Sequence, residues 1–274
     1  METIKCPACK FDETTFFLTS SKKSKFWKCK RCKLVFKFPP TAATYEGDCW
    51  TKAIDPDGTQ RDLTKEQNFK LKNWYGDIVK FILEIQPRKV LDYGCGLGYL
   101  LSALPKSWKK YGFDVSKFSQ LFIKKNFPEI IIIDDLQLDV SKPPKHHYEN
   151  YDVVVSYHVI EHILDPHLFL KHLSMLVKPD GLLIIGTPNI GCISTKIFKG
   201  NFRMLSDDSH LSFFSDKTLQ KLLEKNNFTI IKKEFPYFKT DYFNLKNILR
   251  MLNPTKISPP FYGNIMTFYA KKNK

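Results

Sequence analysis

The feature that most constrains how this chain folds is a run of glycines between residues 89 and 100, in the string KVLDYGCGLGYL. The string begins with apolar residues and then places Gly94, Gly96 and Gly98 on alternate positions, ahead of a second apolar stretch. This order predicts a strand, a tight turn and the start of a helix. Glycine suits the turn because it adopts backbone angles that other residues avoid, and because a ligand can approach it without meeting a Cβ atom.

A second short strand is predicted to end at Asp114, about twenty residues after the turn, where an acid can accept hydrogen bonds from the ribose of a nucleotide-type ligand. The dinucleotide fingerprint G-x-G-x-x-G requires a small residue three places after Gly96, and this chain has Tyr99 there. Because tyrosine would obstruct the close packing of the helix, the sequence disfavours NAD and FAD. A glycine-rich turn in some other α/β protein remains the alternative.

The rest of the chain alternates between short apolar stretches and helical patterns. Strands are predicted at residues 129–134, 151–157 and 182–186, the first of them buried, and helices at 62–86, 116–125 and 165–177. This alternation predicts an α/β fold with a doubly wound, mostly parallel sheet and a ligand site at the carboxyl ends of its strands. Asp134 or Asp135 ends the third strand, where an adenine amino group could donate, and a solvated turn acid is the alternative.

The spacing Asp-x-Gly-x-Gly-x-Gly, starting at Asp92, resembles the first motif of class I S-adenosylmethionine-dependent methyltransferases. Further strings follow in the order of that family, at residues 157–165, 187–189 and 210–215, and residues 258–266 resemble its closing strand. Together they resemble the branch that modifies small molecules such as quinone precursors and sugar nucleotides, over about residues 70–270. The resemblance implies a Rossmann-like domain that binds S-adenosylmethionine.

The resemblance also implies roles for individual residues. Cofactor contacts are expected from the glycine turn and the following strand ends, at Asp92, Gly94, Cys95, Gly96, Gly98, Asp114, Val115, Asp134, Asp135, Tyr157 and His158. Glu161, His162 and His210 are expected to face the acceptor, and histidine is a natural base because its pKa lies near neutrality. Each of these residues taken alone is more often structural than catalytic. Tyr45 and Trp50 are candidates to cover a substrate, with simple packing as the alternative.

The first 40 residues contain two C-x2-C pairs, Cys6 with Cys9 and Cys29 with Cys32, separated by nineteen residues. This spacing predicts a zinc ribbon in which four thiolates close a tetrahedral shell around a structural zinc ion. A segment this short cannot bury enough apolar surface to fold alone, and metal binding supplies the missing stability. Two disulfides are the weaker alternative in a cytosolic chain. The isolated cysteines at 49, 95 and 192 are expected to be packing residues.

The length of 274 residues suits one large domain and one small one. We predict a zinc ribbon at 1–40, a linker or cap segment at 41–68 and a methyltransferase domain at 69–274. No apolar run approaches the roughly 18–20 residues that span a bilayer, and the start lacks the apolar core of a signal peptide. A cytoplasmic location is therefore expected.

The net charge of +15 is unevenly distributed. Residues 1–40 hold ten Lys and Arg against three Asp and Glu, and residues 216–274 hold twelve against four. We predict that these basic ends surround the opening of the site and attract a phosphorylated or nucleotide-linked acceptor, such as a sugar nucleotide or another polysaccharide precursor. The alternatives are a zinc-finger-bearing ribosomal RNA methyltransferase and a non-enzymatic zinc-ribbon adaptor.

Overall fold

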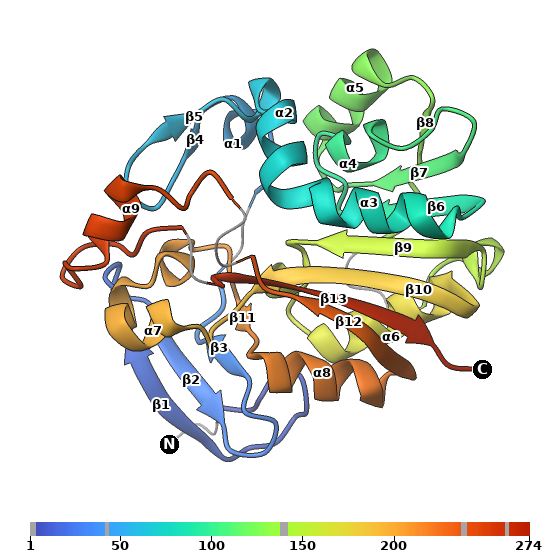
Figure 1. Ribbon diagram of the computed structural model, residues 1–274. Helices are drawn as coiled ribbons and strands as arrows, with labels where there is room; N and C mark the ends of the chain where they lie inside the picture. Colours follow the sequence, from blue (N-terminus) through green and yellow to red (C-terminus); the bar gives the residue numbers. More distant parts are fainter. Residues whose placement is uncertain (1–3, 42–43, 138–141, 237–239, 261–262) are drawn as a thin grey trace.

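A seven-stranded sheet forms the centre of the protein, in the order β12-β13-β10-β9-β6-β7-β8 (Figure 1). The structure is a computed structural model that describes residues 4–41, 44–137, 142–236, 240–260 and 263–274. The strands are β6 (Lys89–Tyr93), β7 (Lys109–Phe113), β8 (Ile130–Ile132), β9 (Tyr151–Tyr157), β10 (Val177–Pro188), β12 (Phe228–Glu234) and β13 (Ile265–Lys272). Strand β13 runs antiparallel to both its neighbours, whereas β10, β9, β6, β7 and β8 are parallel. The predicted doubly wound, mostly parallel sheet is confirmed.

Helices cover both faces of this sheet. One face packs against α3 (Gly76–Ile85), α4 (Tyr99–Ser102) and α5 (Lys117–Asn126), and the other against α6 (Pro166–Leu176) and α8 (Asp216–Lys225). Because successive side chains of a strand point to opposite faces, Val153 and Val155 join the first layer and Val154 the second. Burial on both faces explains why β9 reads as a continuous apolar run.

Two helix starts follow the predicted capping chemistry. The Ser116 hydroxyl accepts from the Ser119 N–H (3.2 Å), and the Asp165 carboxylate accepts from the N–H groups of His167 (3.1 Å) and Leu168 (3.0 Å). These side chains satisfy backbone donors that no helical carbonyl can reach. Local sequence therefore fixes where α5 and α6 begin.

Three predicted elements differ from the structure. The helix predicted at 62–86 is divided into the 3-10 turn η1 (Leu63–Lys65), α2 (Gln67–Lys70), the π-helical turn η2 (Leu71–Tyr75) and α3. The prediction of a buried strand at 129–134 is wrong, because β8 lies at the sheet edge and Ile131 is 51% exposed. The closing strand begins at Ile265 rather than Ser258, since the two prolines after Ser258 lack the N–H that a central ladder requires.

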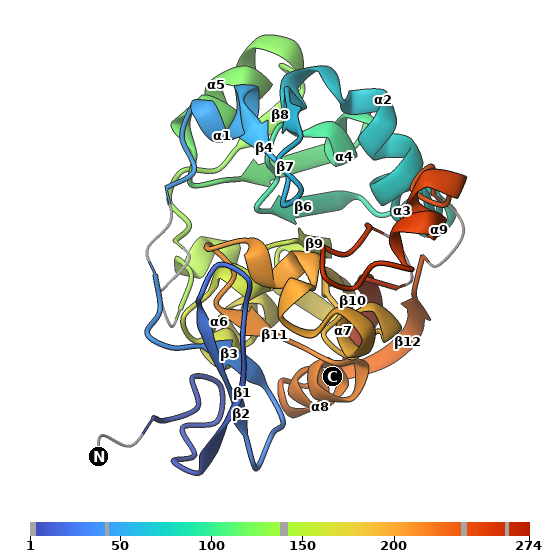
Figure 2. The same ribbon diagram turned by 90° about the vertical axis from the view of Figure 1, so that its left-hand side faces the viewer.

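The N-terminal strands share a sheet with the larger domain. Strands β1 (Thr14–Thr19), β2 (Lys25–Cys29) and β3 (Val35–Lys37) form an antiparallel sheet whose fourth strand is β11 (Ser212–Phe213). This sheet lies beside α7 (Ile193–Phe198) and below the central sheet (Figures 1 and 2). The segment predicted as a ribbon therefore completes its sheet with a strand from about 170 residues later in the chain.

The remaining elements are short and lie around the carboxyl edge of the central sheet or connect its layers. They are α1 (Asp48–Thr51), β4 (Ala53–Ile54), β5 (Gln60–Arg61), η3 (Lys145–His147), η4 (Ile160–His162), η5 (Lys199–Asn201), η6 (Arg203–Ser206) and α9 (Leu245–Arg250). In the described part of the chain, no helix combines the length and the apolar character needed to cross a membrane.

Candidate active site

The glycine turn follows β6 as the sequence predicts. Gly94, Gly96 and Gly98 have φ angles of +85°, +50° and +75°, a region that side chains with a Cβ avoid. A Cβ on Gly94 would lie 2.3 Å from Val159 Cγ2, so a larger residue is excluded there by contact as well. The turn is bound to β7 because the N–H groups of Gly94 and Cys95 both donate to the Phe113 carbonyl, at 2.7 and 2.9 Å.

Asp114, at the end of β7, completes this edge of the sheet. Its carboxylate accepts from the N–H of Gly96 through Oδ2 (2.8 Å) and from the N–H of Ser116 through Oδ1 (2.9 Å). Burial raises the pKa of this carboxyl, and the two backbone hydrogen bonds oppose that effect. Asp114 thus connects the glycine turn to the start of α5.

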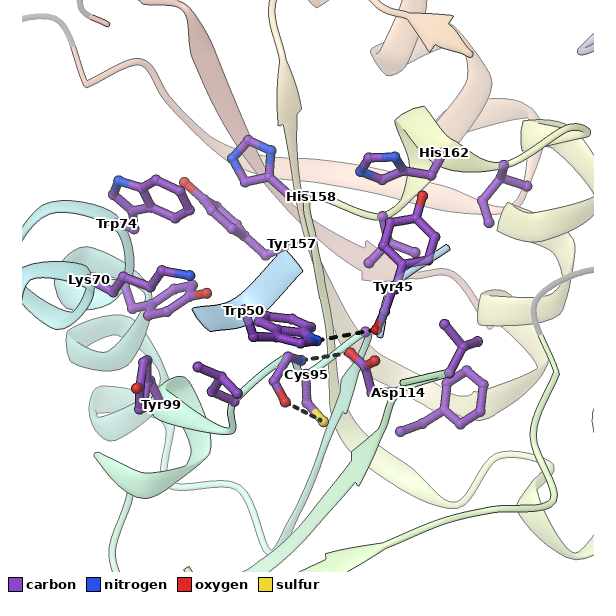
Figure 3. A pocket seen from close by; sticks show the side chains of 18 residues that line it. Tyr45, Trp50, Lys70, Trp74, Cys95, Tyr99, Asp114, Tyr157, His158 and His162 are labelled. Atoms are coloured by element: carbon purple, nitrogen blue, oxygen red, sulfur yellow. Dashed lines mark hydrogen bonds between the residues drawn. The ribbon is translucent and has the colours of Figure 1, made fainter. Parts of the chain in front are cut away.

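A cavity of about 230 Å³ lies over the turn. Seven of the predicted cofactor residues line it: Gly94, Cys95, Gly96, Asp114, Val115, Tyr157 and His158. Figure 3 shows Trp50 across the turn, between Lys70 on one side and Asp114 on the other. Trp50 packs so closely that its ring would be 3.2 Å from a Cβ on Gly96. Tyr45 also lines the cavity, so both aromatic residues expected to cover a ligand do lie at the site.

Four predicted cofactor residues are not part of this wall. Asp92 is buried in β6, and Gly98 ends the turn at the start of α4. Asp134 is exposed, and Asp135 lies 2.9 Å from Nε2 of both His146 and His147. Neither Asp134 nor Asp135 therefore lines the cavity, and the adenine contact expected from one of them stays a prediction.

A second cavity of about 290 Å³ adjoins the first. The two share five wall residues, which are Lys70, Trp74, Tyr157, His158 and His162. Its lining cations are Arg61, Lys70 and Arg203, and no described Lys or Arg of residues 4–40 or 216–274 lines either cavity. The basic ends thus contribute no described cation to the walls of the two cavities, and the expectation that they surround the opening of the site stays a prediction. The cations in the cavity walls come from the middle of the chain. Because basic and acidic residues balance there, the charge distribution along the sequence did not reveal them.

His158 lines both cavities and pairs with Glu161, which is fully buried behind it. Nδ1 of His158 lies 2.8 Å from Glu161 Oε1, and the Thr187 hydroxyl donates to Glu161 Oε2 (2.9 Å). Burial alone would raise the pKa of Glu161, but the hydrogen bond with His158 and the nearby histidine charges lower it to about 2. Nε2 of His158 has no hydrogen-bond partner among the described residues. His158 also has a φ of +59°, a strained value that is typical of functional positions.

His162 and His210 line the second cavity with their rings 4.8 Å apart. Each has Nδ1 bonded to a backbone carbonyl, that of Ser209 for His162 (3.1 Å) and that of Met204 for His210 (2.9 Å). Burial and then the charge of His210 lower the pKa of His162 to about 4. His162 is therefore neutral and weakly basic at physiological pH.

Sequence reasoning missed Lys70, Arg61 and Arg203. The sequence does contain a signal for Lys70. It lies four residues before Trp74 and eight before Ile78, which places it on the apolar face of the predicted helix. A lysine on such a face has to find a polar environment inside the protein. Arg203 follows a loop without periodicity, and no local pattern marks it.

The four N-terminal cysteines converge as predicted. Sγ of Cys6 and Cys32 are 3.5 Å apart, those of Cys9 and Cys29 are 3.6 Å apart, and all four lie within 4.8 Å of one another. Thiolates at zinc–sulfur distances of about 2.3 Å form a tetrahedron with edges of this length. No disulfide joins any of the seven cysteines.

Similar proteins include two ubiquinone biosynthesis O-methyltransferases. The mitochondrial enzyme of Dictyostelium discoideum is 28% identical over 201 residues, which is 63% of this chain and 62% of that protein. The enzyme of Rickettsia typhi is 32% identical over 126 residues, which is 44% of this chain and 46% of that protein. The matched region is thus less than two thirds of either relative's length.

Solved structures with a similar fold include magnesium protoporphyrin IX methyltransferase from Synechocystis PCC 6803, with a TM-score of 0.54, 16% identity and coverage of 79% of this chain and 90% of that one. A SAM-dependent methyltransferase from Archaeoglobus fulgidus has a TM-score of 0.50, 20% identity and coverage of 76% and 97%. The sequence model of the methyltransferase-domain family matches residues 66–233, well over half of the chain. The chain therefore belongs to the methyltransferase-domain family, as its motifs predict.

Proposed function

We propose that this protein is an enzyme that methylates a hydroxyl group of a small molecule, with S-adenosylmethionine as the methyl donor. The observation that supports this best is the pair of adjoining cavities. One lies over the glycine turn and Asp114, and the other contains the histidines and the buried cations. Cofactor and acceptor could then meet beside the five residues that both cavities share.

The residues around the first cavity fit this cofactor. The turn presents backbone without Cβ atoms at Gly94 and Gly96, and each oxygen of Asp114 can accept one more hydrogen bond, which suits ribose hydroxyls. When bound, S-adenosylmethionine supplies a methyl group that its sulfonium charge makes electrophilic. The protein has to align the acceptor, exclude water and remove a proton.

In this proposal His158 removes the proton. It accepts the proton of the acceptor hydroxyl at Nε2, while Glu161 stabilises the resulting imidazolium through Nδ1. Sequence reasoning placed this role on His162 or His210. His158 is the better candidate because it has a hydrogen-bonded carboxylate behind it and contacts both cavities, whereas the pKa of His162 is too low for an efficient base.

The acceptor is the second part of the proposal. The relatives' names support O-methylation and offer nothing for a polysaccharide precursor. We therefore include two classes of acceptor in the test, a quinone-type hydroxyl and the predicted sugar nucleotide.

The test of this proposal is calorimetry with S-adenosylhomocysteine, followed by a mass-spectrometric screen in which labelled donor is offered catechols and sugar nucleotides. Asp114→Ala should weaken S-adenosylhomocysteine binding by about 1–3 kcal/mol, because charge-assisted hydrogen bonds are lost. Unchanged affinity in that variant would remove Asp114 from the cofactor site.

A second variant tests the base. His158→Ala should keep its S-adenosylhomocysteine affinity and lose about 10²–10⁴-fold in kcat. His162→Ala is the matched control, since it removes a neighbouring ring from the same two cavities. A larger loss of kcat in His162→Ala than in His158→Ala would return the role to His162.

We also propose that Cys6, Cys9, Cys29 and Cys32 hold one structural zinc ion. Four thiolates form a closed shell without a position for water, so the ion would support the fold rather than the reaction.

A further inference from the structure

The buried lysines of the described residues differ in whether their ammonium groups have hydrogen-bond or ion-pair partners. Lys37 donates to Thr41 Oγ1 and the Asp208 carbonyl, both at 3.1 Å, and Lys110 lies 3.3 Å from Glu129 Oε1. Lys70 is equally buried, at 7% exposure, yet no described residue forms a hydrogen bond or an ion pair with its ammonium group. The ammonium lies over the Trp74 ring, with Nζ 5.0 Å from the ring centroid.

The surroundings of Lys70 disfavour the charged form of its side chain. Burial first, and then the charge of Arg61, lower its pKa to about 8, against a smaller opposite influence of Glu66. A buried charge without a partner is costly, so most such groups in proteins are paired. The side chain lines both cavities, which leaves the ammonium directed at the space where ligands would lie.

Arg203 lines the second cavity in a similar state. Its side chain is 8% exposed, and the one described carboxylate that pairs with its guanidinium is Asp55, whose Oδ2 lies 3.7 Å from Nη2, beyond hydrogen-bond distance. Asp55 already accepts from Arg61 Nη1 at 3.0 Å, and Arg61 also holds Glu66 through Nε (2.7 Å) and Nη2.

The carboxylates near Lys70 and Arg203 therefore already interact with other side chains. Arg61 occupies Asp55 and Glu66, and Asp207 accepts from Ser209 and faces His210. Lys70 and Arg203 remain as two buried cations in one cavity wall, without enough carboxylate oxygen to match their donors.

We propose that Lys70 and Arg203 form an anion-binding subsite for the acceptor, which therefore carries a phosphate or a carboxylate group. This inference rests on the proposed function, because it treats the second cavity as the acceptor site. A planar guanidinium and an ammonium together suit the oxygens of either anion. A neutral acceptor would leave both charges unpaired.

The test uses the full-length protein saturated with S-adenosylhomocysteine and titrated by calorimetry with inorganic pyrophosphate and, separately, with benzoate. The wild type should bind at least one probe, and the probe that binds identifies phosphate or carboxylate as the preferred group. Arg203→Met and Lys70→Met should each weaken that binding by about tenfold or more. Lys221→Met, which removes an exposed charge from α8, should bind like the wild type and so controls for nonspecific attraction to a basic protein.

Three outcomes would overturn the inference. The first is equal probe binding in all four proteins, and the second is no probe binding in the wild type. The third is a Lys70→Met variant that loses affinity only for S-adenosylhomocysteine, since the lysine would then hold a carboxylate of the cofactor. The wild-type titration with S-adenosylhomocysteine tests the proposed function separately. Thermal unfolding tests for misfolding, and Lys70→Met should be at least as stable as the wild type because it removes an unpaired buried charge.

Discussion

Asp92 and Asp114 are carboxylates near the ends of neighbouring strands, and their surroundings give them different properties. Asp114 receives two backbone hydrogen bonds and lines the cofactor cavity. Asp92 lies in β6, where burial and then the charge of Asp114 raise its pKa to about 8. The motif places both carboxylates near the ends of neighbouring strands, but their different degrees of solvation depend on packing that no local pattern encodes.

Asp92 should make the stability of the protein depend on pH. Its pKa in the unfolded chain is about 3.9, so between roughly pH 4 and pH 8 the folded state binds more protons than the unfolded state. The free energy of unfolding therefore falls as pH rises through this window. Asp92→Asn cannot ionise, and its melting temperature relative to wild type should increase from pH 5 to pH 9. Thermal unfolding at both pH values checks this, with Asp12→Asn as an exposed control; a constant difference would contradict it.

The segment from Tyr45 to Arg61 has no period in the sequence and still contributes five side chains to the two cavities. Long-range contacts hold it in place, which explains why local patterns do not reveal its structure. The Glu46 carboxylate accepts from the N–H groups of Lys117 (3.1 Å) and Phe118 (3.4 Å), and the Trp50 indole donates to the Ser116 hydroxyl (3.1 Å). Helices α5 and α6 could be predicted because their caps lie next to them in the chain.

Trp50 should report cofactor binding. The cavity beside it is about 230 Å³, whereas ligand pockets usually measure about 300–1,000 Å³, so we expect Trp50 and its segment to shift when the cofactor binds. We expect S-adenosylhomocysteine to change the tryptophan emission of the wild type. Trp50→Phe should lose most of this change, and Trp108→Phe should keep it. An undiminished signal in Trp50→Phe would mean that the segment does not move.

Backbone hydrogen bonds connect the N-terminal sheet to the residues around the second cavity. The Lys37 N–H donates to the Leu211 carbonyl (2.9 Å), and the Leu211 N–H donates to the Glu161 carbonyl (2.7 Å). Gly200 also lies against the first hairpin, since a Cβ there would be 2.3 Å from the Thr19 carbonyl oxygen. The cysteine spacing predicted that Cys6, Cys9, Cys29 and Cys32 converge, but the pairing of β3 with β11 joins positions too far apart in sequence for any spacing to indicate.

Loss of metal should therefore affect activity as well as local structure. We expect one zinc ion per chain in protein purified without chelator. Cys29→Ser should lower both the zinc content and the melting temperature, and should also reduce kcat, because β3 supports the backbone of Glu161. Cys49→Ser, at an isolated half-buried cysteine, is the matched control. Full zinc content in Cys29→Ser, or full activity after its loss, would contradict this expectation.

The pairing of β3 with β11 also determines how the protein can be shortened. Cutting the chain after residue 40 would leave β11 as an unpaired edge and expose Phe213, whose ring packs 5.4 Å from that of Phe26. An open strand beside an uncovered aromatic patch tends to pair with a second copy of itself. A fragment reduced to the methyltransferase core should therefore self-associate, and truncation would be a poor route to a smaller working enzyme.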